Sequence, residues 1–156
     1  MATIDTKQMQ HIVTQYIKAG QKWPATTHEM AKWAVAHKLW APQPSTIIDQ
    51  RADHLAKAMR EEYITDPQGR AVRAKHAARV EVDGAQTTLW ADIRTAPKKH
   101  METAFRQRRG QILGECRQLK ADVDSYNQNV TPNDPIPLVL DFTYDLAEEE
   151  ALAAGA

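Results

Sequence analysis

Residues 26–79 constrain the fold more than any other part of this chain. They predict, in order, a short helix, a turn bounded by prolines, a long helix and a β-hairpin. Thr26 and Glu29 have the spacing of a capping box, so we expect a helix to begin there. Pro42 and Pro44 should end that helix, because proline cannot continue a helix. Helices followed by a hairpin over so short a distance indicate an α+β fold.

The long helix and the hairpin after it follow from spacing and turn signals. Ser45 is a good N-cap for a helix that should reach Glu62. The predicted buried face of this helix is formed by Ile48, Ala52, Leu55 and Met59. Residues 66–69, Asp-Pro-Gln-Gly, are typical of a type I turn. Residues 63–65 should therefore pair with a strand that begins at Arg70.

Three further elements flank this segment. An apolar stripe at helical spacing predicts a first helix over residues 5–19. An Asp-Gly pair at positions 83–84, between two segments that alternate, predicts a second hairpin. A long helix is predicted over residues 95–127, with an apolar row that Arg108 and Glu115 interrupt. We expect a domain at residues 1–94, the long helix at 95–128, and a linker with a tail at 129–156.

The composition excludes several classes of protein. The single cysteine, Cys116, rules out an internal disulfide and suits a reducing compartment. No apolar run approaches the length needed to cross a bilayer, and the N-terminus lacks a signal-peptide core. The histidines have no metal-ligand spacing, and no catalytic cluster is apparent. We therefore expect a cytoplasmic, non-enzymatic protein without a membrane partner, metal or cofactor.

Charge is distributed unevenly, although the formal net charge is zero. Residues 1–129 carry all 20 Lys and Arg against 14 of the 20 acids, a balance of +6. Residues 130–156 carry the other six acids and no base, a balance of −6. The formal net charge of zero therefore conceals a basic segment, residues 1–129, that is followed by an acidic segment, residues 130–156.

The predicted long helix and its hairpin carry side chains suited to DNA. On the helix, the side chains able to contact base edges or phosphates are Thr46, Gln50, Asp53, His54 and Lys57. Residues 67–80 contain no acid, and their bases, suited to phosphates or a minor groove, are Arg70, Arg73, Lys75 and Arg79. The alternative is that both sets are ordinary solvated surface.

With these residues in this order, the chain resembles the winged helix-turn-helix superfamily of DNA-binding proteins. The resemblance covers about half of the chain and depends on residues 26–31, the helix from Ser45, and residues 63–70. It implies a helix in the major groove of double-stranded DNA and an enlarged β-hairpin wing on the backbone, as in a transcriptional regulator. Asp49 and Asp53 make the helix face less basic than usual, which favours a larger role for the wing. The alternative is a winged-helix adaptor that binds proteins within a larger assembly.

Two further partners are predicted from the C-terminal half. The helix at residues 95–127 is longer than a small winged domain needs, which favours a homodimer formed through it. The alternative is a helix folded back across the domain. The acidic residues of 130–156 should bind a protein partner or compete with DNA for the basic wing. A solvated, disordered end is the other possibility.

Overall fold

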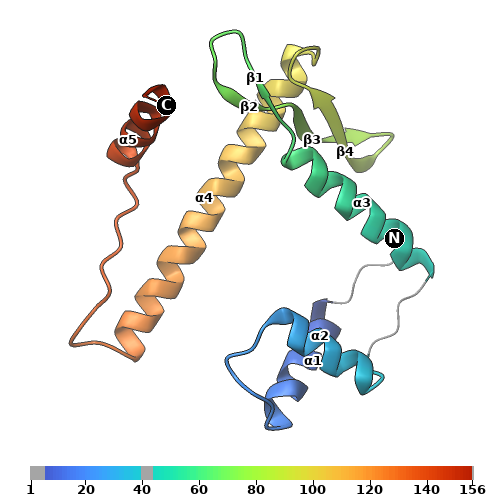
Figure 1. Cartoon of the computed structure of the whole chain (residues 1–156), viewed down its shortest axis with the longest axis vertical. Helices are drawn as coiled ribbons and strands as arrows, with labels where there is room; N and C mark the ends of the chain where they lie inside the picture. The colour runs from blue at the N-terminus through green and yellow to red at the C-terminus, as the bar shows by residue number, and fades with distance from the viewer. Residues whose placement is uncertain (1–5, 40–43, 156) are drawn as a thin grey trace. The chain divides into compact units, whose positions relative to one another are not determined.

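The structure is a computed structural model that describes residues 6–39 and 44–155, without the side chains of residues 44–46. Its contacts divide the chain into two compact units, Met1–Ala74 and Lys75–Ala156, and Figure 1 traces their elements. The first unit contains α1 (Thr6–Lys18), α2 (Thr27–Ala36), α3 (Pro44–Arg60), β1 (Tyr63–Thr65) and β2 (Ala71–Arg73). The second contains β3 (Lys75–Val82), β4 (Ala85–Asp92), α4 (Lys98–Asn129) and α5 (Thr143–Ala154). The predicted α+β class is confirmed.

The helices α1 and α2 pack against each other through aromatic side chains. Tyr16 is buried, and its ring meets the ring of Trp33 edge-on, with 5.5 Å between centroids. The capping box at the start of α2 is present as predicted. The Glu29 N–H donates to Thr26 Oγ1 at 3.1 Å, and the Thr26 N–H donates to Glu29 Oε2 at 2.7 Å. These bonds satisfy donors that a helix N-terminus otherwise leaves unpaired.

The helix α3 forms close to its predicted bounds, but the prediction that its apolar face is buried is wrong. Ile48 is 75% exposed and Leu55 is 64% exposed, while Met59 is half-buried. None of the α3 side chains in the described part of the chain is buried. The reason is that spacing identifies side chains that share a helix face, whereas burial needs another element to cover that face. In the described residues, Tyr16 and Trp33 join α1 to α2 instead.

The first hairpin, β1 with β2, is closed at the predicted turn. Ile64 lies opposite Val72 in the antiparallel register. The Gly69 N–H donates to Asp66 O at 2.9 Å, and Gly69 has φ 87°, a value that glycine adopts without strain. The second strand begins at Ala71, one residue later than predicted.

The second hairpin, β3 with β4, also matches its predicted turn. Val82 lies opposite Ala85, so Asp83 and Gly84 form a two-residue connection. Their φ angles are 50° and 78°, and positive angles at both positions are what a type I′ hairpin turn requires. The two hairpins are separate two-stranded sheets. The second one belongs to the same compact unit as α4, so residues 1–94 do not form one unit by contacts, and their functional division stays a prediction.

The long helix α4 packs its N-terminal part against β3. Ala104 is 3% exposed, and the His100 Nε2–H donates to His76 O at 2.9 Å. Gln107 binds the backbone of Arg79 twice, because its Oε1 accepts from Arg79 N and its Nε2 donates to Arg79 O, both at 2.7 Å. After α4 the chain runs extended and then forms α5, a helix that the sequence analysis did not predict. All described side chains of α5 are exposed.

Candidate nucleic-acid interface

Four of the predicted DNA-contacting side chains lie together on α3. Gln50, Asp53, His54 and Lys57 have the spacing i, i+3, i+4 and i+7, which places them on one side of a helix. Gln50 is half-buried, and the other three are exposed. Thr46 belongs to the same helix, but its side chain lies outside the described residues. The structure therefore brings the described part of the predicted reading face together.

Arg70, in the first hairpin, is tied to the turn by Asp66. The Asp66 carboxylate accepts from the Arg70 N–H at 2.8 Å and from Arg70 Nε at 2.7 Å. The Arg70 backbone N–H, followed by its side chain, lowers the pKa of Asp66 from its usual value. Arg70 nevertheless has a side chain that is 72% exposed, so a phosphate can still reach the guanidinium. Its positive charge is partly neutralised before any DNA arrives.

Lys75 is paired in a similar way on the second hairpin. Its Nζ lies 3.1 Å from Asp92 Oδ2, and the Arg94 guanidinium also binds Asp92, at 2.7 Å. The Arg94 side chain is the largest cause that lowers the pKa of Asp92, and Lys75 adds to it. The Lys75 side chain is only 29% exposed. Lys75 is therefore a weaker phosphate ligand than its place in the sequence indicated.

The predicted wing is also divided between the two compact units. Arg70 and Arg73 belong to the first hairpin, whereas Lys75 and Arg79 belong to β3. Arg73 is half-buried, and Arg79 is exposed. In the described part of the chain Arg79 has no acidic partner, which makes it the most available of the predicted wing cations.

A group of arginines on α4 was not predicted from the sequence. Gln107, which holds the Arg79 backbone, is flanked in the chain by Arg106, Arg108 and Arg109, and all three are exposed. No acidic partner contacts these three within the described residues. The sequence signal for this group is the basic segment Arg-Gln-Arg-Arg at positions 106–109. The Gln107 contact thus brings this basic turn of α4 close to Arg79.

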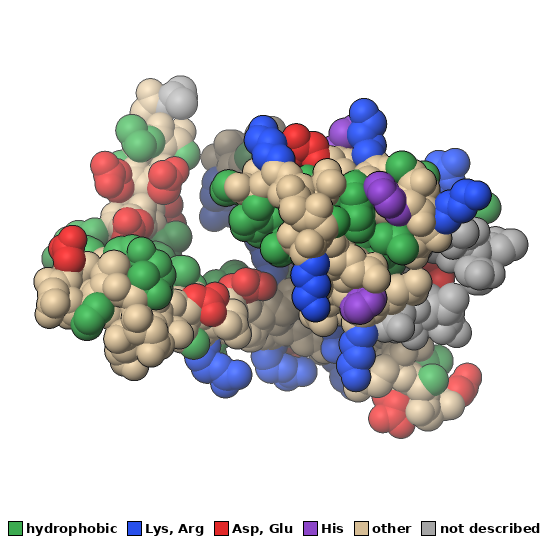
Figure 2. Space-filling view, turned by 90° about the horizontal axis from the view of Figure 1, so that it is seen from below, with side chains coloured by type: hydrophobic (Ala, Val, Ile, Leu, Met, Phe, Trp, Pro, Cys, Tyr) green, Lys and Arg blue, Asp and Glu red, His purple; other side chains and the backbone are tan. Residues whose placement is uncertain are grey.

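A shallow hollow lies on α2 of the first unit. Its lining residues are His28, Ala31, Lys32, Val35 and Ala36. Figure 2 shows apolar side chains bordered by blue and purple side chains on the nearest face, and the blue ones on α1 and α2 are Lys because residues 6–39 contain no Arg. Val35 is 55% exposed. An exposed apolar surface with a polar border is typical of a protein-binding site.

Metal centres and membrane-spanning helices are absent from the described residues. Within 6–39 and 44–155, no three His, Cys, Asp or Glu side chains are grouped so that they could hold a metal ion. None of the helices in that part of the chain has the length and apolarity to cross a membrane. No family model, curated protein or solved structure matches this chain.

Proposed function

We propose that the protein is a non-catalytic DNA-binding protein that acts as a transcriptional regulator of the winged helix-turn-helix type. One observation carries the proposal: the helices α1, α2 and α3 are followed directly by the β1–β2 hairpin, and α3 has a polar face. In winged helix-turn-helix proteins, the helix before the wing enters the major groove. The corresponding helix here is α3.

The side chains of α3 and the hairpins suit different parts of a duplex. Gln50 is the best base-reading candidate, because a carboxamide forms paired hydrogen bonds with adenine N6 and N7. Lys57 lies in the last turn of α3, where its ammonium suits a phosphate. Arg70 and Arg79 are exposed and suit phosphates as well. Gln50 would thus supply sequence preference, and the three cations would supply affinity.

Binding to random-sequence duplex across a salt series tests this proposal. Each neutralised phosphate contributes about −0.9 to the slope of log Kobs against log salt concentration. Contacts from Lys57, Arg70 and Arg79 would together give a slope of about −3. A flat response would refute phosphate contact and, with it, the DNA-binding function.

A second function, a protein-interaction adaptor, is favoured by a different observation. The exposed apolar side chains of α3 include Ile47 at 56% and Ile48 at 75%, and the hollow on α2 adds a further apolar surface. Exposed apolar surface of this kind marks protein-binding sites. The adaptor predicts a flat salt response with random DNA, so the same titration separates the two functions.

A further inference from the structure

One row of large apolar side chains on α4 lies open along most of the helix. The row consists of Phe105, Ile112, Leu119 and Tyr126, which we call the α4 row. These residues are seven positions apart, so they lie on one side of the helix over a length of about 30 Å. Their exposed fractions are 48%, 55%, 47% and 44%. Four half-exposed side chains in line form a continuous apolar stripe, and such a stripe indicates a binding surface.

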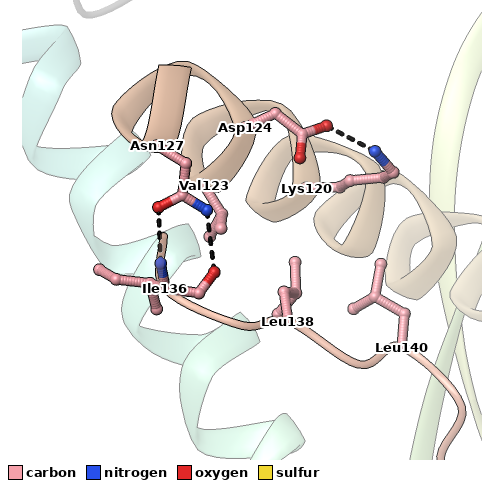
Figure 3. A pocket seen from close by; sticks show the side chains of 7 residues that line it. All are labelled: Lys120, Val123, Asp124, Asn127, Ile136, Leu138 and Leu140. Carbon is pink, nitrogen blue, oxygen red and sulfur yellow. Dashed lines mark hydrogen bonds and ion pairs between the residues drawn. The ribbon is translucent and has the colours of Figure 1, made fainter. Parts of the chain in front are cut away.

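The chain's own elements contact α4 near both of its ends, and one contact involves the α4 row: the Phe105 ring meets the ring of His76 of β3 edge-on, with 5.3 Å between centroids. The hairpin strand β3 covers the N-terminal part near Ala104 and Gln107. Near the C-terminus, the Asn127 carboxamide binds Ile136 twice: its Oδ1 accepts from Ile136 N and its Nδ2 donates to Ile136 O, both at 2.8 Å. Figure 3 shows how this clamp brings Leu138 and Leu140 over the groove beside Val123 and Lys120. The hairpin and the returning segment are thus fixed in place, yet the α4 row remains half exposed.

We propose that the α4 row binds the α4 row of a second copy, with the two helices antiparallel. This inference does not depend on DNA binding. Two helices that pack along their length repeat two apolar positions in every seven residues, and the α4 row supplies one of these two. A two-fold arrangement uses the same surface on both copies and closes at a dimer. An antiparallel pair centred between Ile112 and Leu119 matches Ile112 with Leu119 of the second copy and Phe105 with its Tyr126.

Charge complementarity supports the second copy as the occupant and favours the antiparallel direction. Arg108, Glu115 and Asp122 each follow a member of the row by three residues, so they border it on one side. In an antiparallel pair, Arg108 lies opposite Asp122 of the other copy at both ends. Glu115 lies opposite Glu115 of the other copy, at the two-fold axis. In a parallel pair, identical residues of the two copies lie at the same level. Arg109 would then face Arg109 of the other copy, and Glu102 would face its Glu102, so like charges would meet inside the contact.

The mass of the full chain in solution tests the pairing. Light scattering after size exclusion at micromolar concentration should give twice the chain mass of 17.6 kDa. The double variant Ile112→Glu/Leu119→Glu should be monomeric. It should still show the wild-type circular dichroism, because both side chains are already about half exposed or more. The matched control is Leu113→Glu, which changes a side chain that is 61% exposed, on the same helix but outside the row, and should remain dimeric.

Three results would overturn the proposal. These are a monomeric wild type, a dimer that the double variant leaves intact, or a dimer that Leu113→Glu abolishes to the same extent.

Engineered cysteines test the direction of the helices. In a Cys116→Ser background, Arg108→Cys together with Asp122→Cys should give a covalent dimer under mild oxidation. The two positions are fourteen residues apart on one helix, too far to form a disulfide within a chain. Either substitution alone should give no covalent dimer. A covalent dimer with Arg108→Cys alone, or none with the pair while the mass is still dimeric, would overturn the antiparallel direction.

Discussion

Gln107 offers the sharpest test of how α4 holds the second hairpin. Its carboxamide makes two hydrogen bonds of 2.7 Å to the backbone of Arg79. The side chain is half-buried, so Gln107→Ala should leave the Arg79 N–H and C=O without their partner. Each such bond contributes about 1 kcal/mol net, so the loss is about 2 kcal/mol. At 1.4 kcal/mol per factor of ten, the Arg79 amide should exchange with deuterium about 30-fold faster.

Hydrogen exchange measured residue by residue is the right assay, because it reports the opening of this hairpin and not of the whole chain. Gln107→Glu is an informative second variant. Its carboxylate can still accept from the Arg79 N–H but cannot donate to the carbonyl, so the exchange rate should lie between those of the wild type and the Ala variant. Gln111→Ala serves as the control, because Gln111 is exposed on the same helix. Exchange at Arg79 that stays within about twofold of wild type in Gln107→Ala would refute the idea that this contact holds β3.

Four further predictions concern DNA binding, the tail and pH. Gln50→Ala should cost about 1–3 kcal/mol at one base pair of a selected site, measured by competition with single-base variants. Arg79→Ala should reduce the magnitude of the salt slope by about 1, and Lys75→Ala should reduce it less because Asp92 already pairs with Lys75. Deleting residues 143–156, which hold four acids and no base, changes the formal charge from 0 to +4 and should tighten DNA binding at low salt only. Asp92→Asn should remove stability at neutral pH. Because the folded-state pKa of Asp92 is lowered, the stability it contributes is present above the ordinary pKa of an aspartate, 3.8, and is lost as pH falls below it, which thermal unfolding of the wild type against pH would detect.

The features that the sequence predicted correctly depend on residues close together in the chain. The capping box joins Thr26 to Glu29, and the turn of the second hairpin involves only Asp83 and Gly84. In each case the cause lies within three residues: a side-chain oxygen near a helix N-terminus, or backbone angles that few residues adopt. Such signals act before tertiary contacts form.

The errors concern contacts between distant parts of the chain. The pattern of Ile48 and Leu55 was read correctly as one helix face, but the structure leaves that face exposed. The pairing of Lys75 with Asp92 depends on the register of β3 and β4, which aligns these two residues. From the composition alone, Lys75 is an available cation. Only the register shows that its charge is already matched.

Two carboxamide side chains on α4 also make contacts with distant residues that the sequence does not reveal. These contacts bear on the proposed dimer. Gln107 and Asn127 both use an amide to satisfy the N–H and the C=O of one residue in an extended segment. In the sequence, each is indistinguishable from a solvated polar residue of a helix. Since the two clamps are twenty residues apart, they hold separate segments at the two ends of α4. Phe105 of the apolar row contacts His76 of β3, but all four members of the row stay 44–55% exposed, and this is why a second copy of α4 is the occupant that we propose.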